Sequence, residues 1–453
     1  MNVPLSKGQG LELVIDGLGA RAEGVGRTAG RAVFVPFALP GERCAVQIQH
    51  VGRKRVEARL MEVLEAHPGR CQAPCAVFGR CGGCQLQHAE YALQLELKQR
   101  IVADTLRSVA GVELAEAVPV LGADKPYGYR NRGQYPVGTQ GRELRTGFYA
   151  QGSHELVAVE RCPLHDERVD LVVRSMRAWA QRKKIEVYDE RSHKGFLRHA
   201  VARVAVSSGQ VLAVCVGAVD RKLAYQDLLR RLRRELPELT GLVLNIQPAK
   251  SNVVLGSRNR LLWGQDHVEE RLGGLRFRLS VGSFFQVHLA QAERLFARVL
   301  ELLGKPAGTV LDAYGGVGVL AQLMAQAGHE CLSIEMQASA VADARAAAKL
   351  NGLSGMRFEQ GRVETVLPRL VAGGLRLGAV VMDPPRKGCE ASVLQALADS
   401  GAERIFYVSC HPGSLARDLR RLLDMGYALD GLEAVDMFPQ TAHLECLCRL
   451  SRS

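Results

Sequence analysis

From about residue 305 onward, short apolar runs alternate with helical patterns, and this alternation constrains the fold more than any other feature. The runs are Thr309-Val-Leu-Asp-Ala, Cys331-Leu-Ser-Ile-Glu335, Val380-Val-Met and Arg404-Ile-Phe-Tyr-Val, and an alanine-rich helix is expected over 338–350. Strands that alternate with helices form parallel sheets covered by helices. The sequence therefore predicts an α/β protein with a doubly wound sheet in its C-terminal part.

The length and charge of the chain indicate several domains and a polyanionic partner. With 453 residues the chain is too long for one core, and its 47% hydrophobic content is ordinary for a globular protein. No apolar run approaches the ~20 residues of a membrane span, and the N-terminus lacks the apolar segment of a secretory signal. We expect a cytoplasmic protein with no membrane association and no obligate protein partner. The net charge of +12 favours nucleic acid over a merely solvated basic surface.

Residues 1–65 read as short strands with Gly and Pro turns, which predicts a small OB-like β-barrel. Arg53, Lys54 and Arg55 form a basic cluster on this barrel. Such a cluster suits single-stranded nucleic acid, although a charged edge strand that prevents aggregation is an equal alternative. Beyond the barrel, residues from Tyr91 onward have helical periodicity.

Five of the 12 cysteines are candidate metal ligands. Cys71, Cys75, Cys81 and Cys84 lie close together in one segment, and Cys162 follows far downstream in Arg161-Cys-Pro-Leu. In a reducing compartment, such thiols favour metal binding or catalysis over disulfides. Four thiolates hold either zinc or an iron–sulfur cluster, and the spacing does not decide between these two metals.

Two further features suggest ligand contacts. The first suggests a nucleoside cofactor, and the second suggests RNA. Gly315, Gly316 and Gly318 form a glycine turn, and Glu335 ends the next strand, where a carboxylate accepts the ribose hydroxyls. A tight structural turn is the alternative. The mixed region before residue 280 contains the run Tyr129-Arg-Asn-Arg132, whose aromatic ring, cations and amide suit RNA contacts.

A thiol and two carboxylates define the expected chemistry. Asp383 and Cys410 each follow a predicted strand, and Glu445 follows the late segment Thr441-Ala-His-Leu. Uracil C5 is a poor nucleophile until a thiolate adds at C6, after which a base must remove the C5 proton. Cys410 and Glu445 fit those two roles. The alternatives are an inert buried cysteine and a surface carboxylate.

Taken together, these residues resemble the S-adenosylmethionine-dependent RNA (uracil-5-)-methyltransferase family, specifically its 23S rRNA branch. The resemblance implies a TRAM barrel over 1–65, a central α+β domain with an iron–sulfur loop over 66–280, and a Rossmann-like methyltransferase domain over 281–453. The tRNA-modifying bacterial members usually lack such a barrel, so its presence argues for rRNA. The helix expected over 91–124 would pack on the methyltransferase domain. The resemblance further implies a [4Fe–4S] cluster on Cys75, Cys81, Cys84 and Cys162, with Cys71 spare.

The same resemblance assigns the site residues. It places S-adenosylmethionine on Gln286, Tyr314, Glu335 and Asp383, and it makes Cys410 the nucleophile and Glu445 the general base. The chain departs from the family pattern at a few positions. Gly315 stands where the family usually has cysteine, and His288 and His411 stand where it usually has asparagine. Val319 replaces a residue that is often polar, and Arg362 replaces one that is often aspartate or asparagine.

The sequence therefore predicts an enzyme that transfers a methyl group to C5 of a uridine in 23S rRNA. Two alternatives stay open. The first is the same reaction on tRNA. The second is a catalytically inactive iron–sulfur protein that binds RNA, against which the presence of both Cys410 and Glu445 argues.

Overall fold

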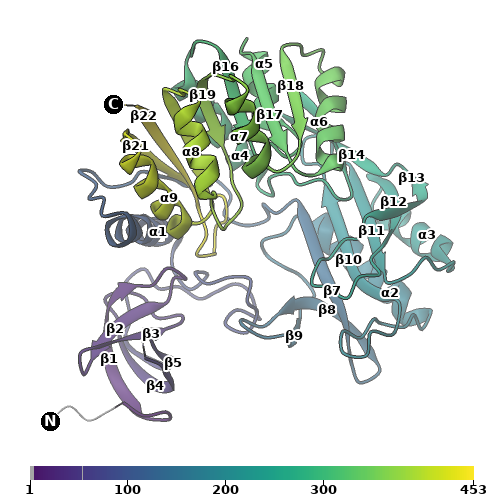
Figure 1. Ribbon diagram of the computed structural model, residues 1–453. Coiled ribbons are helices and arrows are strands. Elements are labelled where there is room, and N and C mark those ends of the chain that lie inside the picture. The colour runs from purple at the N-terminus through teal and green to yellow at the C-terminus, as the bar shows by residue number, and fades with distance from the viewer. Residues whose placement is uncertain (1–4, 54, 453) are drawn as a thin grey trace.

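The computed structural model describes residues 5–53 and 55–452 of the chain. Lys54, part of the basic cluster expected on the barrel, lies outside the described residues. Figure 1 shows a small N-terminal barrel, a central sheet and a C-terminal sheet with its helices. Within the described part of the chain, none of the helices combines the length and the hydropathy that a membrane span requires.

The N-terminal strands close into a barrel in the order β1-β2-β3-β5-β4. These strands are β1 (Gly10–Leu18), β2 (Gly24–Thr28), β3 (Arg31–Val35), β4 (Arg43–Val51) and β5 (Val56–Glu65). Along β4 every second residue from Cys44 to Ile48 is buried in the barrel core, which is the period of a strand with one face covered. The expected β-barrel is confirmed.

The central body is a sheet with the order β13-β12-β11-β10-β7-β8-β9. Its elements are β7 (Arg132–Gln140), β8 (Glu143–Tyr149), β9 (Leu156–Ala158), α2 (Glu167–Arg182), β10 (Leu197–Val204), β11 (Val211–Gly217), α3 (Tyr225–Glu235), β12 (Leu239–Ile246) and β13 (Arg258–Gly264). Trp179 on α2 is fully buried in the core of this body. The hairpin of β14 (His267–Leu272) and β15 (Leu275–Ser280) follows and packs with the C-terminal body.

The C-terminal body is the predicted doubly wound sheet, with the order β18-β17-β16-β19-β20-β22-β21-β6. Its elements are α4 (Leu289–Leu303), β16 (Thr309–Ala313), α5 (Val319–Gln326), β17 (Cys331–Glu335), α6 (Ala338–Leu350), β18 (Met356–Gln360), α7 (Val363–Ala372), β19 (Leu377–Met382), α8 (Ala391–Asp399), β20 (Arg404–Ser409), α9 (Pro412–Asp424), β21 (Tyr427–Val435) and β22 (Glu445–Arg452). The five neighbouring strands β18, β17, β16, β19 and β20 are parallel to one another. Strands β17 and β18 lie on one side of β16, whereas β19 and β20 lie on its other side, so the strand order reverses between β16 and β19. Open α/β sheets bind ligands at such a switch point.

The helix expected over 91–124 is shorter than predicted. It consists of α1 (Tyr91–Thr105) and a final π-helical turn, η1 (Leu106–Ala110), after which Gly111 takes a left-handed conformation with φ of 67°. Val102 and Leu106 pack in the same core as α9, and the short strand β6 (Val120–Leu121) then joins the edge of the C-terminal sheet. This helix therefore packs on the C-terminal body.

Two of the departures from the family pattern are explained by helix caps. The Nδ1 atom of His288 accepts a hydrogen bond from the backbone N–H of Gln291 at the start of α4, at 3.5 Å. The Nδ1 atom of His411 accepts from the backbone N–H of Ser414 at the start of α9, at 3.1 Å. An asparagine oxygen would accept the same bonds, so histidine replaces asparagine at both helix starts through its Nδ1 atom.

Candidate active site

A cavity of about 770 Å³ lies at the carboxyl ends of β16, β17, β19 and β20. It is lined by every residue that the sequence proposed for cofactor binding and catalysis: Gln286, Tyr314, Glu335, Asp383, Cys410 and Glu445. Six side chains spread over 160 positions of sequence therefore meet at the switch point of one sheet, as strand-end positions predict.

The glycine turn between β16 and α5 has little room for side chains. Gly316 and Gly318 take left-handed conformations with φ of 56° and 73°. A Cβ atom on Gly315 would lie 2.1 Å from the hydroxyl of Ser333 and 2.7 Å from the carboxylate of Asp312. Ser333 on the neighbouring strand and Asp312 therefore occupy the space that a side chain at position 315 would need. The family usually has cysteine at this position, and here the residue is glycine.

Two carboxylates hold the turn in place. The Oε2 atom of Glu335 accepts a hydrogen bond from the backbone N–H of Gly316 at 3.1 Å. Asp312 is buried, and one of its oxygens accepts from the backbone N–H of Ala321 at 3.2 Å. Burial raises the pKa of Asp312 to about 7. Glu335 thus joins the glycine turn to the end of β17 while it lines the cavity.

The segment that carries Gln286 is fixed by three side chains from the central body. The side-chain amide of Asn131 donates to the carbonyl of Gln286 at 3.1 Å. The guanidinium groups of Arg132 and Arg203 both donate to the carbonyl of Ser283. The suggestion that Asn131 contacts RNA is wrong, because this side chain is buried and holds the protein backbone. The half-buried Arg132 is bonded to two backbone carbonyls and also lines a cavity. Tyr129 is also buried, and its ring stacks on His288.

Cys410 directly follows β20 and is half-buried in the cavity wall. Burial raises the pKa of its thiol to about 11, and the neighbouring carboxyls of Glu445 and Asp383 act in the same direction. Arg386 opposes this shift because it stabilises the thiolate. The resting thiol is therefore protonated at neutral pH, and Arg386 is the cation next to it.

Arg386 is the site residue whose role the sequence did not identify. Its guanidinium donates to Nε2 of His443 at 3.1 Å, so this imidazole is an acceptor and hence neutral. Burial and the nearby cations, Arg386 first among them, lower the pKa of His443 to about 4. The signal was present in the sequence as Asp383-Pro-Pro-Arg, where the arginine stands in place of an aromatic residue.

Glu445 is the first residue of β22 and is buried, so the surface-carboxylate alternative is wrong. Its Oε2 atom has no hydrogen-bond partner within the described residues. Burial and, secondly, the carboxyl of Asp383 raise the pKa of Glu445 well above its usual range, and burial raises the pKa of Asp383 to about 7. When ionised, Glu445 is therefore a stronger base than an exposed carboxylate.

Arg362 and Val319, two departures from the family pattern, also line this cavity. The guanidinium of Arg362 lies 3.3 Å from the carboxylate of Glu390 and 3.7 Å from that of Glu364. Its charge is therefore balanced at the rim of the cavity, where the family often has an acid or an amide.

A second cavity of about 420 Å³ lies beside the first and is lined by Cys75, Cys81, Cys84 and Cys162. Cys71 is not among its lining residues and is exposed. Burial, followed by the neighbouring thiols, raises the pKa of Cys84 to about 12. In the described chain, no group of three or more His, Cys, Asp or Glu side chains is arranged to hold a metal ion. Phe284 is exposed and lines both cavities.

Comparison with known proteins agrees with this geometry. Residues 90–453 match the family model of the tRNA (uracil-5-)-methyltransferases, and residues 4–61 match that of the TRAM domain. An uncharacterised RNA methyltransferase of Halalkalibacterium halodurans is 36% identical over 99% of this chain and 98% of its own length. One from Gloeobacter violaceus is 38% identical over 99% of this chain and 98% of its own length.

One solved structure is also similar over nearly the whole chain. The Pyrococcus abyssi tRNA (uracil-54, C5)-methyltransferase, in complex with S-adenosyl-L-homocysteine, has a TM-score of 0.78 and 27% identity over 97% of this chain and 99% of its own. The fold is thus that of an α/β methyltransferase with an N-terminal TRAM barrel. The chain belongs to the tRNA (uracil-5-)-methyltransferase family of RNA methyltransferases.

Proposed function

We propose that this protein uses S-adenosylmethionine to methylate C5 of a uridine in 23S rRNA, giving 5-methyluridine. The observation that carries the proposal is the single cavity at the switch point, which joins four candidate cofactor residues to a thiol and a buried carboxylate. An inactive RNA-binding protein would have no use for Cys410 and Glu445 in one cavity wall.

The residues of this cavity fit the cofactor. Glu335 ends β17 at the position from which a carboxylate accepts ribose hydroxyls, and Gln286, Tyr314 and Asp383 complete the proposed binding set. The similar Pyrococcus abyssi enzyme was solved with S-adenosyl-L-homocysteine, the product of methyl transfer. When bound, S-adenosylmethionine supplies an electrophilic methyl group.

In the proposed reaction, the Cys410 thiol gives its proton to solvent, Arg386 favours the resulting thiolate, and the thiolate adds to C6 of uracil. The electron pair of the C5–C6 double bond becomes available at C5, which bonds to the methyl carbon as the bond from that carbon to sulfur breaks. Glu445 then removes the proton from C5. The freed pair restores the double bond, the Cys410 sulfur leaves as a thiolate, and the proton passes from Glu445 to solvent.

We also propose that Cys75, Cys81, Cys84 and Cys162 hold a [4Fe–4S] cluster. All four line one cavity, and Cys71 does not. The chemistry of four thiols suits either zinc or an iron–sulfur cluster, and the preference for the cluster rests on the resemblance of the cysteine segment. The proposed reaction has no redox step, so we assign the cluster a structural or RNA-orienting role.

The tRNA alternative is favoured by one specific observation. The N-terminal barrel was expected to separate rRNA enzymes from tRNA enzymes, yet the tRNA methyltransferase of Pyrococcus abyssi matches 97% of this chain. The barrel therefore does not decide the substrate. The preference for 23S rRNA therefore rests on the resemblance of the cysteine segment to the rRNA branch.

Mapping 5-methyluridine in a deletion strain tests the substrate. We expect the modification to disappear from 23S rRNA and to return when the intact gene, but not a Cys410→Ala variant, is restored. Loss from tRNA alone would move the substrate to tRNA. Unchanged 5-methyluridine in both RNAs would contradict the proposed reaction.

A further inference from the structure

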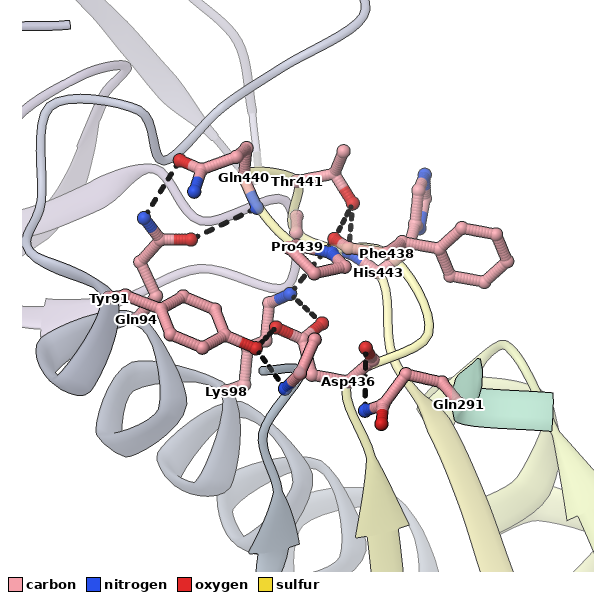
Figure 2. A network of polar contacts seen from close by, with 12 residues as sticks. Tyr91, Gln94, Lys98, Gln291, Asp436, Phe438, Pro439, Gln440, Thr441 and His443 are labelled. Atoms are coloured by element: carbon pink, nitrogen blue, oxygen red, sulfur yellow. Dashed lines mark hydrogen bonds and ion pairs between the residues drawn. The ribbon is translucent and has the colours of Figure 1, made fainter. Parts of the chain in front are cut away.

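The loop 436–444 joins β21 to β22 and supplies two parts of the active site. Phe438 lines the larger cavity, and Glu445 begins the strand directly after the loop. Figure 2 shows that polar side chains of α1 reach this loop from a distant part of the chain. Val435 and Glu445 pair in the sheet at the base of this loop, so the loop begins and ends at the edge of the sheet that carries Glu445.

A fully buried ion pair ties the start of the loop to α1. The Nζ atom of Lys98 lies 2.5 Å from Oδ1 of Asp436, and neither side chain is exposed at all. Lys98 also donates to the carbonyl of Phe438 at 3.1 Å. Tyr91 donates to the other oxygen of Asp436 at 2.9 Å. Both carboxylate oxygens and one loop carbonyl are thus held by one helix.

The middle of the loop is held by the same helix face. The amide of Gln94 donates to the side-chain oxygen of Gln440 at 2.9 Å and accepts from its backbone N–H at 3.0 Å. Gln440 has a φ of 71°, a left-handed conformation that is strained for a residue other than glycine. The backbone N–H groups of Gln85 and Leu86, next to Cys84, donate to the Gln440 carbonyl from the other side.

Tyr91, Gln94 and Lys98 are spaced three and four residues apart, so they share one face of α1. A buried ion pair contributes little net stability compared with apolar residues of similar size, but it does fix geometry. Simple attachment of a helix to a sheet would not require a lysine there. We propose that Lys98 and Asp436 form a clamp that positions Phe438 and Glu445 for the reaction, an inference that rests on the proposed function.

The test replaces the clamp without leaving a buried charge unpaired. In Lys98→Met/Asp436→Leu we expect thermal stability and S-adenosylmethionine affinity close to those of the intact protein, because both charges are removed together. Backbone amides of 436–444 should exchange hydrogen faster. Turnover on target RNA should fall by about a hundredfold, as misplacement of a catalytic group predicts, with covalent protein–RNA complex accumulating because proton removal is slowed.

A milder variant and a control keep the test decisive. Gln94→Met removes both bonds to Gln440, together with the bond that Gln94 donates to the Ala89 carbonyl just before the start of α1. It leaves the ion pair intact, so it should give the same changes at smaller size even if the double variant does not fold. Asn245→Ala removes a buried amide that bonds Gly256 and Asn259 in the central sheet. This control should lower stability without faster exchange in the loop and without accumulation of the complex.

Two results would overturn the clamp. Unchanged hydrogen exchange in 436–444 for both clamp variants would show that α1 does not fix the loop. Faster exchange with normal turnover would show that the loop need not be fixed for reaction. Hydrogen exchange shows whether the clamp fixes the loop even if the protein does not methylate uridine. A failure of the clamp proposal is therefore distinct from a failure of the proposed reaction.

Discussion

At Cys410, three ionisable neighbours act on one thiol. The carboxyls of Glu445 and Asp383 reinforce the effect of burial, which raises the pKa to about 11, and Arg386 acts against them. A thiol with this pKa is almost entirely protonated at pH 7, so we expect its reactivity to depend on the cation beside it.

This balance predicts the pH dependence of alkylation at Cys410. Below the pKa only the thiolate fraction reacts, so the rate with iodoacetamide should rise about tenfold per pH unit from pH 7 to 10. Arg386→Leu should slow the reaction at each pH, whereas Arg386→Lys should retain most of it. Mass spectrometry of the Cys410 peptide measures the rate. A plateau near pH 8.5 in the intact protein would contradict the raised pKa.

Glu445 is predicted to act after methyl transfer. Glu445→Gln cannot accept the C5 proton, so turnover should fall by about 10²- to 10⁴-fold. Covalent protein–RNA complex should then accumulate on ordinary RNA, visible as a band that migrates slowly in denaturing gels. The double variant with Cys410→Ala is the control and should form no complex. Normal turnover by Glu445→Gln would remove this residue from the mechanism.

The sequence predicted the site residues better than their partners. Strand-end positions and the family resemblance gave the six residues that meet in the cavity. They did not give the bond from Asn131 to Gln286 or that from Lys98 to Asp436, because such bonds join positions 155 and 338 residues apart. Local patterns carry no information on which distant residues meet. Tyr129 and Asn131, both buried, were misread for the same reason.

At the scale of elements, buried parallel strands were the easiest to predict. Strands β16, β17, β19 and β20 are almost continuously buried and therefore appear as apolar runs. The end of the helix beginning at Tyr91 was harder, since periodicity alone does not reveal a left-handed glycine such as Gly111. The strand β6 is two residues long and is defined only by its pairing with β21.

The cysteine segment gives a prediction about the metal that it holds. Protein purified without oxygen should be brown and contain about four irons per chain when the cluster is complete. Cys162→Ser should lose the iron, because this thiol lines the cavity from a different segment, and Cys71→Ser should keep it. Iron analysis and the visible spectrum provide the measurement. One zinc per chain with no iron, or a cluster lost in Cys71→Ser but not in Cys162→Ser, would contradict the assignment.

At the scale of the whole molecule, only some of the basic side chains that make up the net charge of +12 are free to contact RNA. Arg55, expected in the basic cluster, pairs with the buried Glu23 at 2.6 Å and lies over the ring of Phe34. Its charge is therefore used within the barrel. Arg53 and Arg59 are exposed and have no ion pair among the described residues, so they are the better candidates for phosphate contacts.

The double variant Arg53→Ala/Arg59→Ala tests this role of the barrel. Each lost phosphate contact on a single strand reduces the slope of log affinity against log salt by about 0.7, so RNA binding should weaken and its salt dependence should flatten. Arg43→Ala is the matched control, because Arg43 is already paired with Glu12 and Glu65. Unchanged affinity and slope in the double variant would show that these two arginines do not grip the substrate.

The most direct test of the central claim is covalent capture of Cys410 by RNA with 5-fluorouridine at the target position. After addition and methyl transfer, C5 carries fluorine in place of the proton that Glu445 would remove, so the adduct cannot resolve. We predict a stable complex that requires S-adenosylmethionine for the methylated adduct, with the RNA mapped to the Cys410 peptide and absent in Cys410→Ala. An adduct that persists in Cys410→Ala, or no adduct while 5-methyluridine is still formed on normal RNA, would contradict this account.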